Sequence, residues 1–259
     1  MDTTLRSCRL ESWLLTVIMA GLSLFLLFPV IFMFQLSVSP PAAVLTQHPP
    51  FIMSSLTLEH WQAVFSAGQI WAPFSKSFWV ATGTMLMGLL LAAPAAYVLS
   101  RMPGRWGSLL LLSLFATRML PEVSLALPVS TVFIKWNLLD TSVGLILAHL
   151  IRVLPLMAWI MVNMFQTIPR DLEAAAAIDG CSRLQTLWKV VMPLAAPGIG
   201  VACIFAWLES WNEFLYALYL CLFHNTLPLE IYYYVQRGSS FHSAAYTTIL
   251  VVPVIIVVL

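Results

Sequence analysis

The chain has 259 residues, of which 61% are hydrophobic and only 9% are charged, and its formal net charge is +1. Soluble domains carry about a quarter charged residues, so the composition excludes a soluble protein and indicates an integral membrane protein surrounded by lipid. The small net charge and the lack of a long basic run argue against a nucleic-acid partner.

The first apolar run, Trp13 to Leu36, follows Arg6 and Arg9. It is longer than the core of a secretory signal, which has about 7 to 15 residues, and no small-x-small cleavage site follows directly. We therefore expect a retained membrane-spanning helix.

Six stretches have, or nearly have, the roughly 20 apolar residues that a helix needs to cross a bilayer. They are Trp13 to Leu36, Phe74 to Leu99, Trp106 to Phe133, Val143 to Phe165, Leu194 to Leu220 and Ala244 to Leu259. The sequence therefore predicts an all-α membrane protein with six transmembrane helices. Residues 1–38 form the N-terminal tail and first span, residues 39–72 an outer loop, and residues 73–259 a five-helix core.

The Lys and Arg residues of the connections predict the orientation, because they are enriched on the cytoplasmic side. With a cytoplasmic N-terminus, seven lie inside and three outside. The inner residues are Arg6, Arg9, Arg101, Arg105, Arg170, Arg183 and Lys189, and the outer ones are Lys76, Lys135 and Arg237. We expect the segment 168–193 to be cytoplasmic in a multi-pass protein of the inner or plasma membrane.

This segment, 168–193, is unusually polar for the chain and predicts two short helices. Acidic residues near its start suit a helix N-terminus, and Ala174 to Ala177 are strong helix formers. Gly180 ends the first helix by taking a left-handed conformation, and Ser182 with Gln185 forms a capping box for the second.

The second helix is expected to have one apolar face and to stop at Pro193. The residues of this face are Leu184, Leu187, Trp188 and Val191. Two such short helices are marginal alone in water, so we expect them to dock on another surface.

Ionisable residues within the spans point to a pathway or to internal partners, because a membrane charge costs about 2.5 to 3.5 kcal/mol. Arg118 and Glu122 are four apart on one helix face, with Pro121 between them as a site where the helix can bend. They form either an ion pair that neutralises itself or part of a pathway lining. His149 and Arg152 are three apart, and we expect the histidine to be a hydrogen-bonded packing residue.

Glu209 and Glu213 are also four apart and flank Trp211 and Asn212. Two carboxylates on one face can serve general acid and base catalysis, but the sequence has no accompanying nucleophile or metal set. We therefore favour a polar face on a water-filled cavity or a partner subunit over an enzyme. An interfacial anchor is the alternative for Trp211.

Two further groups have ordinary explanations beside functional ones. Tyr232, Tyr233 and Tyr234 in the last outer loop can stack on a sugar ring or belong to an interfacial aromatic belt. The four cysteines have neither the spacing of a metal site nor that of a disulfide framework, so we expect no metal.

The segment LEAAAAIDGCSRLQTLWKVVMP resembles the cytoplasmic EAA loop of ABC importer permeases. Gly180 and Pro193 have the family spacing of thirteen. The Glu position of the family pattern is Ala174, and the acidic residue lies one position earlier, at Glu173. Three further segments, PPFIMSSLTLEHWQAVF, RMLPEVSLALPVSTVF and WNEFLYAL, are similar to the maltose-transporter type, the second of its two unlike membrane subunits.

This resemblance implies a type I ABC importer permease fold with cytoplasmic coupling helices. The implied ATPase-coupling residues are Glu173, Ala174, Ala175, Ala176, Asp179, Gly180, Leu184 and Pro193, and the candidate pathway residues are Arg118, Glu122, Trp211, Asn212 and Glu213. The implied partners are an unlike permease, an ATPase dimer and an extracytoplasmic solute-binding protein.

The sequence has no phosphate-binding loop, so no cofactor is expected on this chain, and ATP and Mg are expected in the partner ATPase. The implied solute is a sugar, either a disaccharide or an oligosaccharide, and polyol and glycerol-phosphate importers share these motifs. An ion-coupled secondary transporter and a non-transporting membrane scaffold are the alternatives.

Overall fold

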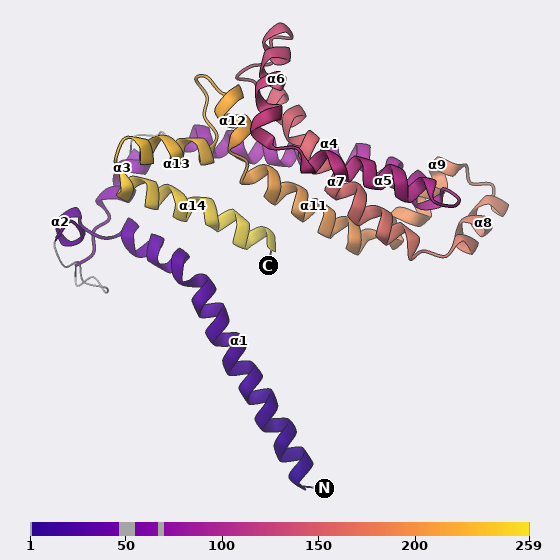
Figure 1. Ribbon diagram of the computed structural model, residues 1–259, viewed down its shortest axis with the longest axis horizontal. Coiled ribbons are helices and arrows are strands. Elements are labelled where there is room, and N and C mark those ends of the chain that lie inside the picture. The colour runs from indigo at the N-terminus through magenta and orange to yellow at the C-terminus, as the bar shows by residue number, and fades with distance from the viewer. Residues whose placement is uncertain (1, 47–54, 67–69, 259) are drawn as a thin grey trace. The chain divides into compact units, whose positions relative to one another are not determined.

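A computed structural model describes residues 2–46, 55–66 and 70–258 of the chain (Figure 1). These residues form helices joined by turns, and no strand occurs among them. They group into two compact units: Met1–Gln69 with Ile231–Pro253, and Ile70–Glu230 with Val254–Leu259. The second unit contains the expected coupling segment and the membrane charges.

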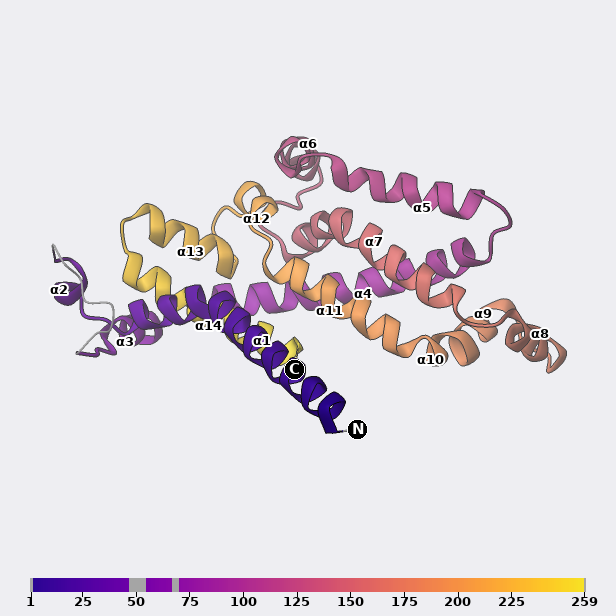
Figure 2. The same cartoon turned by 60° about the horizontal axis from the view of Figure 1, so that its bottom comes forward.

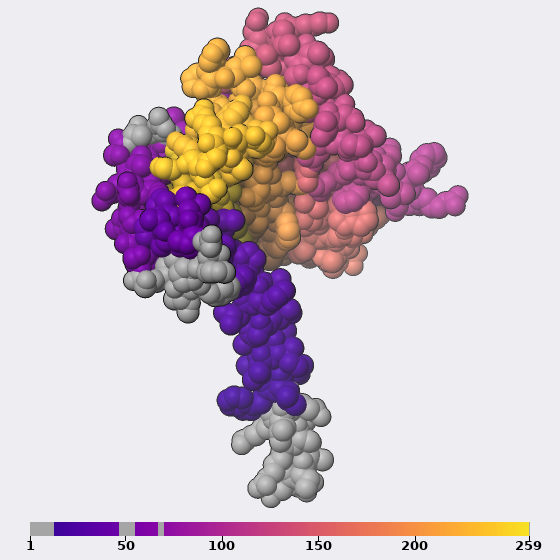
Figure 3. Space-filling view, turned by 60° about the vertical axis from the view of Figure 1, so that its left-hand side comes forward, coloured from indigo at the N-terminus to yellow at the C-terminus, as the bar shows by residue number. Residues whose placement is uncertain are grey.

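The first unit contains α1 (Asp2–Ser37), α2 (Pro41–Val44), α3 (Glu59–Ser66) and most of α14 (Ser240–Val258). The large apolar side chains of α1 are exposed from Trp13 to Phe34. This helix is the indigo part of the space-filling view (Figure 3), and exposed apolar side chains are expected for a helix in lipid. The N-terminal span is therefore present as predicted.

A small hydrogen-bonded cluster joins α3 to the chain that follows α1. The imidazole Nε2 of His60 lies 3.1 Å from the carbonyl of Ser39, and Trp61 donates from Nε1 to Oγ of Ser37 at 3.1 Å. The His60 ring also stacks on Phe241, with 5.0 Å between ring centroids. The loop between the first two spans is thus partly helical and packed.

The core of the second unit is formed by α4 (Trp71–Arg101), α7 (Ser142–Gln166) and α11 (Ala196–Trp211), which pack side by side (Figures 1 and 2). Small residues let these helices approach closely, as is usual in membranes. A Cβ placed on Gly198 of α11 would lie 2.5 Å from Met164 of α7, so the contact requires glycine.

The expected span from Trp106 to Phe133 is not one straight helix. It consists of α5 (Trp106–Ala116), the 3-10 helix η1 (Thr117–Met119) and α6 (Glu122–Lys135), with a 90° bend between the two halves. Leu120 is extended because it precedes a proline, and Pro121 becomes the N-cap of α6. Pro121 therefore breaks the helix between Arg118 and Glu122.

The expected span from Leu194 to Leu220 is also interrupted. The helix α11 ends at Trp211, and the short α12 (Leu215–Leu220) follows after a break. Before α11, α9 (Arg183–Thr186), the π-helix η2 (Leu187–Val191) and α10 (Met192–Leu194) form a helical arm at 84° to it. The arm ends at Leu194, one residue after the predicted stop at Pro193, and a π turn directly precedes this last helical turn.

Four helices of the described chain are long and apolar enough to cross a membrane, or six when each bent pair counts as one span. The fourth single span, α14, begins at Ser240, four residues before the predicted start. Leu259, the predicted end of that span, lies outside the described residues. The all-α membrane fold is confirmed.

Candidate functional site

The coupling segment lies at one end of the second unit, where α8 (Arg170–Ile178) and α9 project beyond the ends of α4 and α7 (Figure 2). Its first helix begins after Pro169 and closes as predicted. Gly180 has φ +85°, and the backbone N–H groups of Gly180 and Cys181 donate to the carbonyls of Ala177 and Ala176. These two hydrogen bonds form the Schellman motif, which only a residue tolerant of positive φ completes without strain.

The predicted capping box of the second helix is also present. The backbone N–H of Gln185 donates to Oγ of Ser182 at 3.3 Å, and the backbone N–H of Ser182 donates to Oε1 of Gln185 at 2.9 Å. Only half of the predicted apolar face is buried. Leu187 and Val191 are buried, whereas Leu184 and Trp188 are exposed.

Glu173 fastens α8 to the end of α4. Its Oε1 accepts a hydrogen bond from Nε of Arg101 at 2.7 Å and forms an ion pair with Nη2 at 2.5 Å, and its Oε2 accepts from the hydroxyl of Tyr97 at 2.6 Å. Arg101 also donates to the carbonyl of Ile168 at 3.1 Å. Tyr97, Arg101 and Glu173 therefore form a clamp, which the sequence pattern alone did not indicate.

The opposite side of α8 is small and apolar, and it is exposed. Ala174, which occupies the Glu position of the family pattern, and Ala175 are exposed, whereas Ala176 is buried against the protein. Ile178 is 87% exposed, and Leu184 beyond the turn is 63% exposed. We call Ala174, Ala175 and Ile178 the exposed face of the coupling segment, whereas Leu184 lines a cavity of about 670 Å³ together with Tyr97 and Glu173.

A chain of alternating charges lies between α6, α7 and α11. Arg118 pairs with Glu209, Arg152 donates from Nε to Oε1 of Glu209 at 2.6 Å, and Arg152 also pairs with Glu122. Of the two predicted alternatives for Arg118 and Glu122, the mutual ion pair was wrong, because the bend at Pro121 separates their helices. Arg118 instead pairs with Glu209 of α11, and Glu122 pairs with Arg152 of α7.

Two cavities adjoin this chain of charges. One, of about 420 Å³, is lined by Arg118, Glu122 and Arg152 together with apolar residues of the bend. The other, of about 530 Å³, is lined by Glu122, Arg152, Glu209 and Asn212. Glu122 and Arg152 line both cavities, so the two spaces share a polar wall.

The remaining candidate pathway residues have different surroundings. Glu213 lies beyond the end of α11, so it does not share a helix face with Glu209 as predicted. Its carboxylate accepts hydrogen bonds from the backbone N–H groups of Tyr216 and Ala217 at 2.7 and 3.2 Å and thereby caps α12. Trp211 is fully buried and stacks on Trp207, with ring centroids 5.0 Å apart, so it is a packing residue.

His149 is a buried packing residue, as predicted. Its Nδ1 lies 2.7 Å from Oγ of Ser210, and its Nε2 lies 3.1 Å from Oε2 of Glu213. The side chain therefore connects α7 to the end of α11.

The three tyrosines Tyr232, Tyr233 and Tyr234 lie on α13 (Leu227–Gln236). The rings of Tyr232 and Tyr233 have centroids 5.7 Å apart, and Tyr234 stacks between His242 and Tyr246 at 5.9 and 4.9 Å. Tyr234 is thus engaged within its own unit. Tyr232 and Tyr233 are half-buried.

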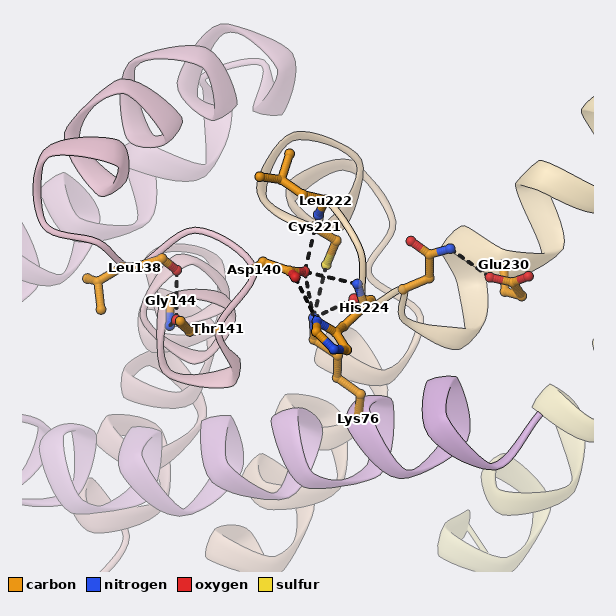
Figure 4. A network of polar contacts seen from close by, with 10 residues as sticks. Lys76, Leu138, Asp140, Thr141, Gly144, Cys221, Leu222, His224 and Glu230 are labelled. Atoms are coloured by element: carbon orange, nitrogen blue, oxygen red, sulfur yellow. Dashed lines mark hydrogen bonds and ion pairs between the residues drawn. The ribbon is translucent and has the colours of Figure 1, made fainter. Parts of the chain in front are cut away.

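Asp140, whose role the sequence did not indicate, is the centre of a hydrogen-bond network at the end of the second unit opposite the coupling segment (Figure 4). It has φ +58°, and its Oδ1 accepts hydrogen bonds from the backbone N–H groups of Leu222 and His224, both at 3.1 Å. Its Oδ2 lies 2.7 Å from Nδ1 of His224, and Lys76 lies 3.5 Å from Oδ1. Lys76 also donates to the carbonyl of His224 at 2.5 Å.

The environment of Asp140 changes the pKa of its carboxyl group. Burial raises the pKa, but the hydrogen bonds from His224 and Leu222 and the charge of Lys76 outweigh it and lower the pKa to about 2. The carboxylate therefore stays ionised and holds the loop after α12 against α4 and α7.

Bent and broken membrane helices, a polar wall between them and a projecting helical segment at one end are compatible with a membrane transport component. Residues 84–259 match the family model described as binding-protein-dependent transport system inner membrane component. The chain belongs to this family, and it is a multi-pass inner membrane protein.

Named relatives agree with this assignment. The chain is 35% identical to the sulfoquinovosyl glycerol transport system permease protein SmoH of Agrobacterium fabrum over 74% of this chain and 67% of that protein. It is 30% identical to the trehalose transport system permease protein SugB of Mycobacterium tuberculosis over 90% of this chain and 86% of that protein. Family membership favours the importer permease over the secondary transporter and the scaffold.

The fold has a solved counterpart. A chain in the crystal structure of a bacterial ABC transporter involved in the import of the acidic polysaccharide alginate superposes with a TM-score of 0.77 at 23% identity, covering 97% of this chain and 95% of that chain. The importer permease fold is confirmed.

Proposed function

We propose that this chain is the sugar-specific permease subunit of an ATP-driven importer and forms half of the translocation pathway beside a second, unlike permease. The relatives support a sugar or sugar derivative as the solute, since their names specify trehalose, arabinooligosaccharides, trehalose or maltose, and sulfoquinovosyl glycerol. A disaccharide or oligosaccharide is the solute class that the first three names share.

The observation that carries the proposal is the exposed face of the coupling segment. Ile178 on this face and Leu184 beyond the turn expose apolar surface on a short helical pair that is clamped to α4 by Glu173. Large apolar side chains exposed to water indicate a partner, and the small Ala174 and Ala175 allow that partner to approach closely. An ATPase dimer is the partner proposed, and ATP and Mg belong to it.

The orientation follows from charge. The coupling segment carries Arg170, Arg183 and Lys189, and the bias toward cytoplasmic Lys and Arg supports a cytoplasmic location for this segment and for the N-terminus. The opposite end, with Asp140 and His224, then faces the solute-binding protein. Tyr232 and Tyr233, which belong to the other unit, stay candidates for outer-loop contacts.

Replacing Ile178 with glutamate tests the ATPase dock. The variant places a charge in the centre of the exposed face, so we expect the ATPase to be lost from the affinity-purified complex while the unlike permease stays bound. Phe223→Glu is the matched control, because Phe223 is 84% exposed at the other end of the unit. Stoichiometric ATPase on the Ile178→Glu complex would contradict the proposed dock.

A further inference from the structure

The alternating charges between α6, α7 and α11 are matched within the chain. The carboxylate of Glu209 forms ion pairs with the guanidiniums of both Arg118 and Arg152, and Arg152 also forms an ion pair with Glu122. Two cations thus meet two anions. An ion pair inside a membrane protein is stable only when each charge is compensated in this way.

This cluster is open to the cavities and is not sealed in the core. The side chain of Arg152 is 39% exposed and that of Glu122 is 26% exposed, and both line the two cavities. Asn212 is exposed and lines the 530 Å³ cavity with them. Within the described chain, Oε2 of Glu209 is buried and has no hydrogen-bond partner.

Glu213, the fifth charged residue that lines the cavities, has partners outside this cluster. Glu213 lines the 530 Å³ cavity, but its carboxylate is held by two backbone N–H groups of α12 and lies 3.1 Å from His149. Among the described residues that line the cavities, both guanidiniums are paired with carboxylates. An anionic solute would therefore have to displace a carboxylate, whereas hydroxyl groups can bind to the polar wall without breaking an ion pair.

We infer that Arg118, Glu122, Arg152 and Glu209 form a charge-matched wall that binds the hydroxyl groups of an uncharged sugar and excludes acidic ones. This inference rests on the proposed function and narrows its solute class. Glu209 is the specificity-determining residue, because its removal leaves two guanidiniums beside the cavity with only Glu122 to compensate them.

The charge of the wall can be measured without knowing the solute. A single cysteine is introduced as Asn212→Cys into a chain whose four native cysteines are replaced, and the complete importer complex is purified. The cysteine is labelled separately with the anionic sulfonatoethyl and the cationic trimethylammonioethyl methanethiosulfonate, and this subunit is followed by intact mass spectrometry. The ratio of the anionic to the cationic labelling rate, divided by the same ratio for free 2-mercaptoethanol, reports the electrostatic potential at residue 212.

We expect the anionic reagent not to be favoured in the parent Asn212→Cys complex. Glu209→Gln should raise the anionic-to-cationic ratio about tenfold at low salt, because a unit charge about 6 Å away changes each rate about threefold even at the dielectric constant of water. Arg152→Gln should lower the ratio, and salt should shrink both effects. The control Glu230→Gln, which pairs with Asn225 and lines neither cavity, should leave the ratio unchanged.

Three results would overturn the inference. They are an unreactive Asn212→Cys, a parent complex that favours the anionic reagent, and a ratio that neither Glu209→Gln nor Arg152→Gln changes. Sugar uptake by the same complexes separates this inference from the proposed function, since a complex that transports sugar while failing the labelling test refutes the charge-matched wall alone.

Discussion

Replacing Glu173 with alanine is expected to release α8 from α4. The substitution removes the hydrogen bond from Tyr97 and the paired contacts from Arg101, at 2.5 to 2.7 Å. The side chains of Arg101 and Glu173 are only 16% and 17% exposed, so solvent screens them weakly. Charge-assisted hydrogen bonds of this kind contribute about 1.5 to 3 kcal/mol each and are not additive, so we expect the clamp to contribute about 3 kcal/mol.

Hydrogen exchange measures this release directly. A loss of about 3 kcal/mol in the free energy of local opening lowers the protection of the amides in α8 by about 100-fold, or to the unprotected limit. Glu173→Gln should have an intermediate effect because it keeps an acceptor without the charge. Asp171→Asn, at an exposed acidic residue of the same helix turn, is the matched control and should lower protection by no more than about fivefold, the effect of removing one charge from the helix N-terminus.

Unchanged protection of α8 in Glu173→Ala would refute the clamp. An equal loss in Asp171→Asn would also refute it, since the effect would then arise from the helix N-terminus and not from the contact with α4. Uptake per ATP hydrolysed should fall with protection, because a loosened α8 transmits less motion to α4.

Three further predictions concern single positions. Gly180→Val should leave assembly intact but lower uptake per ATP hydrolysed in proteoliposomes, because valine at φ +85° costs about 1 to 2 kcal/mol. Gly180→Asn should have a milder effect, because asparagine tolerates positive φ better. Unchanged uptake per ATP in Gly180→Val would refute the role of Gly180 in coupling. Asparagine at position 140 tolerates the positive φ, but Asp140→Asn should lower the unfolding free energy by about 2 kcal/mol at pH 7. A carboxyl pKa lowered to about 2 gives stability that is complete above the ordinary pKa and lost as pH falls toward 2. A difference in unfolding free energy between variant and parent that does not shrink between pH 5 and pH 2 would contradict this. Gly198→Val should lower the melting temperature by forcing α11 away from Met164, whereas Gly200→Ala, which adds a Cβ in open space, should not.

The local structure of the coupling segment was predictable because adjacent residues determine it. Gly180 has positive φ and closes α8, and Ser182 with Gln185 caps α9, as the spacing indicated. The π turn from Leu187 to Val191 was not predictable from the same rules.

The partners of the charged residues were not predictable from spacing alone. Arg118 and Glu122 lie on one face only if their helix is straight, and the bend at Pro121 sends them to Glu209 and Arg152 instead. The clamp at Glu173 likewise joins residues more than 70 positions apart. Contacts of this kind depend on how helices pack, which a single sequence does not specify.

We propose that this permease draws its energy from a partner ATPase bound to the coupling segment. Sugar uptake into proteoliposomes that contain the complete importer, with binding protein outside and ATP inside, measures this dependence. We expect uptake of a labelled sugar from a panel of neutral disaccharides and oligosaccharides to require ATP and to persist when ionophores abolish all ion gradients. Uptake without ATP that stops when the gradients are abolished would contradict the claim.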